Sequence, residues 1–114
     1  MNYDRNHILP YVLQIEQEKI MKQKIIKLNL EPQYYKGVTI LLIKRNYNDY
    51  KAKRYMLGSR SSGQNVWIPN AYLEEDGTLK PNINIDFIFI KANLDGKFKK
   101  AGLSNFGLAP IDSN

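Results

Sequence analysis

The chain has 114 residues, of which 43% are hydrophobic and 25% are charged, and its formal net charge is +6. This length suits one compact domain with its own core, so we predict a single domain over residues 1–114 with a flexible tail at 104–114. The sequence contains no cysteine, which excludes disulfides, a thiolate nucleophile and a cysteine-based zinc site, and favours a reducing, cytoplasmic location.

No stretch of the sequence has the pattern of a membrane span or of a signal peptide. The longest apolar run, Val38 to Ile43, is far shorter than the roughly 20 residues that cross a bilayer. The first residues, MNYDRNHILPYVLQ, lack a basic segment followed by an unbroken apolar segment. We therefore expect no membrane partner.

Apolar residues at helical spacing predict one N-terminal helix. They recur from Ile8 to Met21, and Pro10 fits best in the first turn, so we expect the regular helix to begin near Leu9. Residues 24–30, KIIKLNL, alternate between apolar and polar side chains, which predicts a half-buried strand. The next segment, PQYYKG, is expected to form one helical turn or a loop.

The middle of the chain has the pattern of a β-hairpin. Val38 to Ile43 is continuously apolar and predicts a central strand, whereas Tyr50 to Leu57 alternates. Turn-forming residues lie between them at 46–49. A glycine- and serine-rich loop at 58–63 precedes a brief extended segment, Val66 to Ile68.

The last third of the chain is expected to add two more strands. A short helical turn from Asn70 to Leu73 and a turn at residues 75–77 precede the apolar run Ile83 to Ile90, which we predict to be a strand. A hairpin turn at residues 93–96 and a returning strand at 97–103 follow. The prediction is an α+β fold, in which five or six short strands close into a small mixed β-barrel beside one N-terminal helix.

The chemistry-bearing residues do not form a catalytic constellation. His7 is the only histidine, and it lies near the start of the chain, which disfavours a catalytic triad and excludes a multi-histidine metal site. The acidic run Glu74 to Asp76 is followed by Gly77, which is typical of a turn. We predict no enzyme activity, cofactor, metal or small-molecule substrate, and expect His7→Ala to leave the biological activity unchanged.

Basic and aromatic residues alternate in one half of the chain. Between Lys36 and Arg60 there are seven lysines and arginines but one acid, Asp49, and five tyrosines lie in or next to this segment. Such interleaving suits RNA, because cations hold phosphates while rings stack on unpaired bases. The alternative is that the tyrosines cap the core while the lysines solvate the outer surface of the sheet.

The predicted RNA-binding residues come mainly from the strand and loop at 50–60. Strand alternation places Lys51, Lys53 and Tyr55 on one face and Arg54 on the other. The full predicted set is Lys51, Lys53, Tyr55, Arg60 and Lys99. One contiguous positive surface formed by this set favours RNA, whereas scattered positions favour a protein-interaction module that uses the acidic turn and exposed tyrosines.

Three aromatic residues are predicted to be structural. Trp67 is the only tryptophan and has Val66 and Ile68 as neighbours, so we predict that it fills the core. Phe87 and Phe89 lie in the predicted strand at 83–90 and are assigned to the same core.

Two stretches of the chain resemble known proteins. IIKLNLEPQYYKGVTILLIKR is similar to the opening of the pseudouridine synthase and archaeosine transglycosylase (PUA)-like fold. VWIPNAYLEEDGTLKPNINIDFIFIKA resembles the small PrgU-type proteins encoded on conjugative plasmids of Gram-positive bacteria. Over about residues 24–102, this resemblance implies a PUA-like barrel and a non-catalytic RNA-binding regulator of plasmid conjugation or surface-adhesin genes. It assigns no binding residue to this chain.

Overall fold

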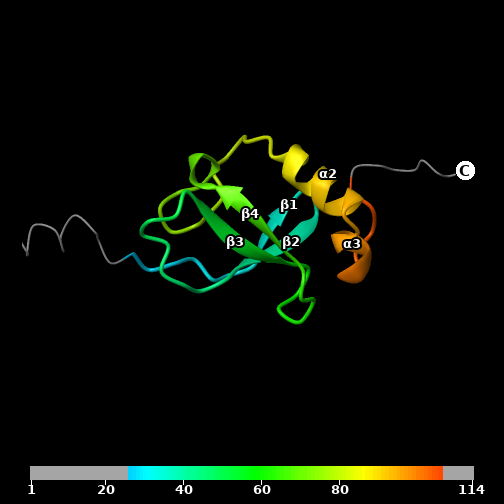
Figure 1. Cartoon of the computed structure of the whole chain (residues 1–114). Coiled ribbons are helices and arrows are strands. Elements are labelled where there is room, and N and C mark those ends of the chain that lie inside the picture. The colour runs from blue at the N-terminus through cyan, green and yellow to red at the C-terminus, as the bar shows by residue number, and fades with distance from the viewer. Residues whose placement is uncertain (1–25, 107–114) are drawn as a thin grey trace, which may run out of the picture.

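The computed structural model describes residues 26–106, so the predicted N-terminal helix, His7 and the chain after residue 106 lie outside the described part. Four strands precede two short α-helices, which makes a small α+β fold (Figure 1). The elements are β1 (Gln33–Tyr35), β2 (Val38–Leu42), β3 (Ala52–Leu57), β4 (Asn65–Pro69), the 3-10 helix η1 (Asn70–Tyr72), α2 (Asp86–Leu94) and α3 (Lys97–Lys100).

The four strands form one open antiparallel sheet in the order β1-β2-β3-β4. The prediction of a closed mixed β-barrel is wrong. Three of the strands expected to take part in it are absent: residues 26–30 have no strand structure, and the segments predicted at 83–90 and 97–103 contain α2 and α3 instead. The strands that remain leave β1 and β4 as unpaired edges of the sheet.

The predicted hairpin in the middle of the chain is confirmed. β2 pairs with β3, the extended segment around Trp67 is β4, and a helical turn follows at η1. The segment PQYYKG is not helical, because Gln33–Tyr35 forms β1 and pairs with β2. Lys36 and Gly37 make the tight connection with φ values of 48° and 85°, the left-handed conformations that two-residue hairpin turns require.

α2 is a helix because its buried residues have helical spacing. Phe89 and Ala92 face the core, three residues apart, and Ile85 precedes them by one further turn. The Asn84 side chain accepts a hydrogen bond of 3.0 Å from the Asp86 N–H, which helps the chain to turn into the helix. A short continuous apolar run is compatible with either a strand or a buried helix, and here the helical packing is realised.

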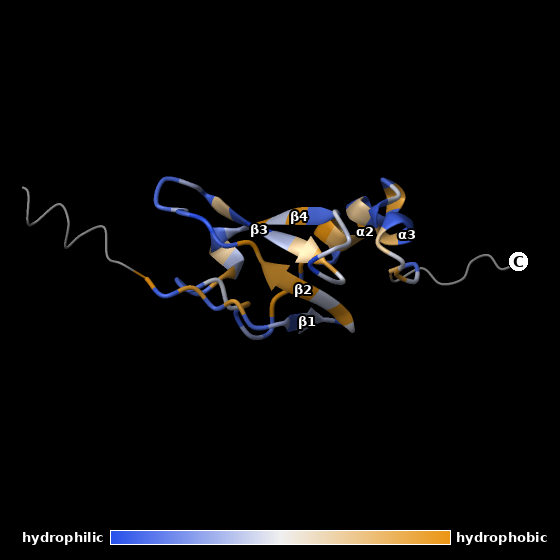
Figure 2. Ribbon diagram, turned by 90° about the horizontal axis from the view of Figure 1, so that it is seen from below, coloured by the Kyte–Doolittle hydropathy of each residue, from blue (hydrophilic) through white to orange (hydrophobic). Residues whose placement is uncertain are grey.

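The core lies between one face of the sheet and the two helices. β2 is largely hydrophobic along its length, as Figure 2 shows, and α2 packs against both β4 and α3. The Phe89 ring is fully buried and stacks on the Tyr35 ring with 4.9 Å between centroids, which confirms Phe89 as a core residue. The largest fully buried side chains are those of Tyr55, Phe89, Phe98, Ile40, Leu42, Leu57, Ile68 and Ile85.

The register of β3 and β4 determines how Arg54 and Trp67 meet. Backbone hydrogen bonds of 2.8 Å mark the pairs 57/64 and 51/70 as hydrogen-bonded pairs. Alternation along the ladder makes Arg54 and Trp67, which are register partners, a non-hydrogen-bonded pair. Side chains approach each other most closely in pairs of this kind.

The same register turns the backbone groups of Asn65, Trp67 and Pro69 toward the free edge of the sheet. Pro69 has no N–H at this edge. The Asn65 carbonyl oxygen accepts a hydrogen bond of 2.9 Å from Lys97 Nζ, which reaches it from α3. The edge of β4 is thus partly blocked by a proline and by a lysine.

Candidate nucleic-acid interface

Two of the predicted RNA-binding residues belong to the interior. Tyr55 has no exposed surface, and its hydroxyl donates a hydrogen bond of 2.6 Å to the Gly77 carbonyl oxygen. Lys53 is 8% exposed, and its ammonium donates to Asn70 Oδ1 at 3.0 Å. Burial lowers the pKa of Lys53 and raises that of Tyr55. Their assignment to an RNA-binding surface is wrong, because the face that they share is the core side of the sheet.

The other three predicted residues are exposed but lie on separate elements. Lys51 precedes β3 and Arg60 follows it, so the six residues of the strand hold them about 20 Å apart. Arg60 donates to the Leu30 carbonyl oxygen at 3.3 Å, and Lys99 lies in α3. The five predicted residues therefore do not form one contiguous surface.

Trp67 and Phe87 are not core residues. Trp67 is 40% exposed, whereas its neighbours Val66 and Ile68 are 4% and 0% exposed. Because successive side chains of a strand point to opposite faces, the inward positions of these neighbours turn Trp67 outward. Phe87 is 56% exposed on the outer side of α2, opposite the buried Phe89.

The exposed indole of Trp67 is stacked on another exposed ring. Its partner is Tyr50, which precedes β3, and the two ring planes are 3° from parallel with centroids 5.8 Å apart. Tyr50 is 41% exposed. At this separation parallel rings overlap with an offset, so part of each ring surface stays open to solvent.

Two arginines complete this surface. The Arg45 guanidinium lies 4.8 Å from the Tyr50 ring centroid and 6.0 Å from that of Trp67, and its Nη2 donates to the Tyr50 hydroxyl at 2.8 Å. The Arg54 guanidinium lies 5.9 Å from the Trp67 ring centroid. Its Nε donates to Asn65 Oδ1 at 2.9 Å, which fixes its direction. We call Arg45, Tyr50, Arg54 and Trp67 the aromatic-arginine face.

The guanidinium groups of this face retain donors for an anion. Within residues 26–106, the ion pairs Lys36–Asp86 and Lys91–Asp95 lie elsewhere. Each arginine has five N–H donors in a planar group, and only one N–H of each is used in the contacts above. The face can therefore offer ring surfaces and bidentate hydrogen bonds at the same place.

A buried tyrosine supports the face from below. The Tyr47 ring meets the Tyr50 ring edge-on with centroids 5.8 Å apart, and it is itself 7% exposed. Its hydroxyl donates to the Ile43 carbonyl oxygen at 2.5 Å, and burial raises the pKa of this phenol. Tyr50 is thus held in place by the core, which reduces the entropy lost when a ligand binds.

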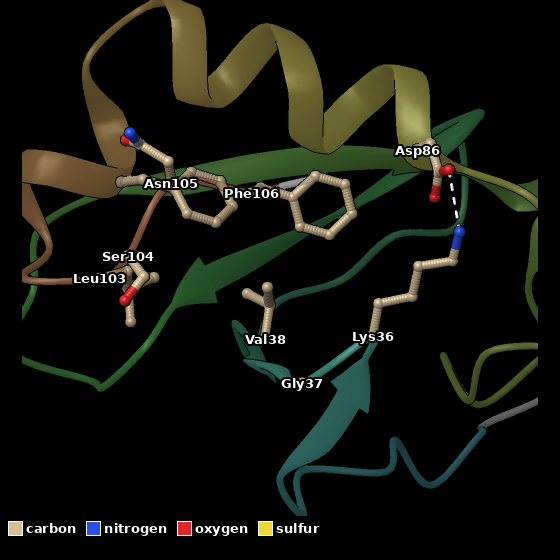
Figure 3. A pocket seen from close by; sticks show the side chains of 9 residues that line it. Lys36, Gly37, Val38, Asp86, Leu103, Ser104, Asn105 and Phe106 are labelled. Atoms are coloured by element: carbon tan, nitrogen blue, oxygen red, sulfur yellow. Dashed lines mark hydrogen bonds and ion pairs between the residues drawn. The ribbon is translucent and has the colours of Figure 1, made fainter. Parts of the chain in front are cut away.

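A concave region lies beneath the start of α2 (Figure 3). It has a volume of about 410 Å³, and Val38 and Phe106 contribute apolar surface to it. At its rim, Asp86 accepts hydrogen bonds from the Tyr35 hydroxyl at 2.5 Å and from Lys36 Nζ at 2.9 Å. These bonds, the one from Tyr35 first, lower the pKa of Asp86. Because Lys36 and Asp86 pair with each other, we interpret these contacts as a structural link between the hairpin of β1 and β2 and the start of α2. We call this link the Asp86 clamp.

Residues 26–106 contain no group of three or more histidine, aspartate or glutamate side chains placed to hold a metal ion. None of the helices in this range has the length and apolar composition to span a membrane.

The sequence contained a signal for the aromatic-arginine face. Trp67 lies between Val66 and Ile68, and Arg54 lies between Lys53 and Tyr55. Because the neighbours of Arg54 and of Trp67 point into the core, strand alternation places both Arg54 and Trp67 on the outer face of the sheet. Comparison with known proteins adds nothing to this assignment, since no family model, no curated protein and no solved structure matches the chain.

Proposed function

We propose that this protein binds single-stranded RNA through the aromatic-arginine face. The observation that carries the proposal is the parallel stack of Tyr50 and Trp67, 5.8 Å between centroids, with a guanidinium next to each ring on the exposed side of the sheet. Unpaired bases stack on exposed rings of this kind, and the stacking contributes about 1–3 kcal/mol per base.

The architecture supports this mode of binding. The core cluster lies on one face of a four-stranded antiparallel sheet, with α2 packed against β4, and Arg54 and Trp67 project from the other face. Open sheet surfaces with exposed aromatic residues are a common platform for RNA. The net charge of +6 adds a long-range attraction for polyanions.

The proposed role is binding without catalysis. The resemblance to PrgU-type proteins favours a regulator of plasmid conjugation or surface-adhesin genes, but the closed barrel that it implied is absent. The proposal for RNA therefore rests on the face itself.

The alternative function is a protein-interaction module that binds its partner through the acidic turn at residues 74–76. The structure of this turn supports that function less than the aromatic-arginine face supports RNA binding. Asp76 Oδ1 accepts a hydrogen bond of 2.9 Å from the Thr78 N–H, and this bond lowers the pKa of Asp76. The carboxylate is thus engaged in shaping the turn. The Gly77 N–H also donates to the Glu74 carbonyl oxygen at 3.0 Å, as a tight turn requires.

The test compares short single-stranded and duplex RNA by fluorescence anisotropy at low and physiological salt. We expect the wild type to prefer single strands, and a Tyr50→Ala, Trp67→Ala double variant to lose most of this preference. The matched control is Tyr34→Ala, since Tyr34 is an exposed tyrosine, 66% accessible, on the distant edge strand β1. No binding by the wild type at low salt, or equal binding by the double variant, contradicts the proposal.

A further inference from the structure

α2 has a second apolar face that points away from the core. Phe87, Ile90 and Leu94 are 56%, 36% and 76% exposed, whereas Phe89 and Ala92 on the opposite side are buried. At about 100° per residue, the three exposed side chains fall within one arc of about 60°. A helix that is apolar on both sides is expected to have a second environment besides the core.

The segment formed by α2 and α3 is rich in lysine, and of these lysines Lys97 is held by the Asn65 carbonyl oxygen at 2.9 Å. Residues 86–100 contain four lysines, Lys91, Lys97, Lys99 and Lys100, against two aspartates, Asp86 and Asp95. Both aspartates are already paired, Asp86 with Lys36 at 2.9 Å and Asp95 with Lys91 at 3.1 Å. Figure 1 shows α2 and α3 side by side at one end of the sheet. Lys99 and Lys100 are exposed in α3, close in sequence to Leu94.

We propose that the α2–α3 surface binds the surface of an anionic lipid bilayer, with Phe87, Ile90 and Leu94 inserted among the headgroups and with Lys99 and Lys100 facing the lipid phosphates. Apolar side chains can insert at the membrane interface while nearby lysines interact with anionic headgroups, which is a common way for proteins to bind a bilayer surface. Each lysine near an anionic surface adds about 1 kcal/mol to such binding.

The size of the apolar face favours a bilayer over a protein partner. A stable protein interface buries about 800 Å² on each partner, which takes roughly 20–30 residues. Three side chains on nine residues of helix cannot supply that area. A fluid bilayer needs no complementary shape and accepts a few inserted side chains, provided that the charges match.

The membrane surface does not compete with the aromatic-arginine face. Arg54 and Trp67 project from the outer face of the sheet, and α2 packs on the inner face through Phe89. The two proposals therefore rest on different residues and fail independently.

The test is co-sedimentation with vesicles of phosphatidylcholine alone and of phosphatidylcholine mixed with phosphatidylglycerol. We expect binding to the mixed vesicles at low salt and little binding to phosphatidylcholine alone. An Ile90→Gln, Leu94→Gln variant should bind the mixed vesicles on the order of tenfold more weakly. Lys99→Gln should weaken binding about fivefold, the equivalent of about 1 kcal/mol.

The matched control is Trp67→Ala, which should bind these vesicles as the wild type does. Circular dichroism should show that the exposed substitutions leave the fold unchanged. Three outcomes overturn the proposal: no binding to the mixed vesicles, wild-type binding by the Ile90→Gln, Leu94→Gln variant, or a dimer in sedimentation equilibrium that this variant dissociates. The last outcome identifies the apolar face as an interface between two copies of the chain.

Discussion

Arg54 and Trp67 face each other across β3 and β4, and the guanidinium of one lies 5.9 Å from the ring centroid of the other. Their sequence neighbours Tyr55 and Ile68 are completely buried. One step along either strand thus separates the aromatic-arginine face from the core. Substitutions at adjacent positions should consequently divide into those that alter RNA binding and those that alter stability.

Trp67→Ala should impair RNA binding and only modestly affect stability. Truncation of a buried tryptophan costs about 3–5 kcal/mol, but the exposed indole of Trp67 loses mainly its stack on Tyr50, which is worth about 1 kcal/mol. Binding to single-stranded RNA should weaken by the equivalent of about 1–3 kcal/mol for each base that stacks on the ring. Urea denaturation followed by circular dichroism and anisotropy titrations measure the two effects. A loss of stability as large as that for a buried tryptophan would indicate that Trp67 is part of the core.

Arg45→Gln and Arg54→Gln should each reduce the salt dependence of RNA binding. If each guanidinium neutralises one phosphate of a single strand, the slope of log K against log salt should fall by about 0.7 per substitution. Lys51→Gln is the control, because Lys51 is an exposed cation outside the aromatic-arginine face. A change of slope in the control equal to that in both arginine variants would argue for diffuse electrostatic attraction.

Tyr55→Phe should reduce stability slightly and leave RNA binding unchanged. The substitution removes the hydrogen bond of 2.6 Å from the Tyr55 hydroxyl to the Gly77 carbonyl oxygen. That oxygen keeps a second donor, Gln33 Nε2 at 3.0 Å, so the expected cost is about 1 kcal/mol. Denaturant midpoints and anisotropy are the measurements. Weaker RNA binding by a stable variant would show that the Tyr55 side chain is accessible to the ligand.

Asp86 should contribute to the loss of stability in acid. Hydrogen bonds from Tyr35 and Lys36 hold the pKa of Asp86 below its usual value, which is about 3.9 in an unfolded chain. A carboxyl whose folded pKa is depressed stabilises the fold above the unfolded pKa, and this stabilisation is lost as the pH falls through the folded pKa. Urea midpoints measured below pH of about 5 should therefore decline less steeply for Asp86→Asn than for the wild type. If the urea midpoints of the wild type and of Asp86→Asn declined equally with pH, protonation of Asp86 would not be coupled to unfolding.

Gly77→Ala should destabilise the fold more than Gly63→Ala. Both glycines have positive φ, +91° and +74°, so each alanine carries a similar backbone cost of roughly 1–2 kcal/mol. A Cβ at Gly77 lies 2.6 Å from Leu42 Cδ2, whereas a Cβ at Gly63 has no atom within 4 Å. The clash should add about 1–3 kcal/mol, as overpacked cores do. Thermal unfolding of the two variants tests this difference, and equal destabilisation would refute it.

Local patterns in the sequence predicted strands β2, β3 and β4 of the sheet correctly, but they did not predict β1 or the helices that follow residue 83. The alternation in β3 and the turn before it were enough for the hairpin with β2, because a half-buried strand leaves that period in the sequence. The run from Ile83 to Ile90 has no clear period, and in the structure its Phe89 packs against Tyr35, a residue distant in the sequence. The predicted barrel failed with it, since it depended on counting this run as a strand.

The candidate site shows a similar limit. Alternation correctly placed Lys53 and Tyr55 on one face and Arg54 on the other, but it does not say which face is buried. Which face of β3 is buried is determined by contacts with residues distant in sequence. Lys53 donates a hydrogen bond to Asn70, and Tyr55 donates one to Gly77. Lysine can enter such a position because its apolar stem packs while its ammonium finds a partner.

The partly blocked edge of β4 disfavours the association of two copies of this chain through that edge. A strand added at that edge would need hydrogen bonds from Asn65, Trp67 and Pro69, but Pro69 offers no donor and Lys97 already occupies the Asn65 carbonyl oxygen at 2.9 Å. Added strands are the first step toward intermolecular sheets and fibrils. The aromatic-arginine face therefore lies beside an edge that offers an added strand fewer backbone hydrogen bonds than an open edge would.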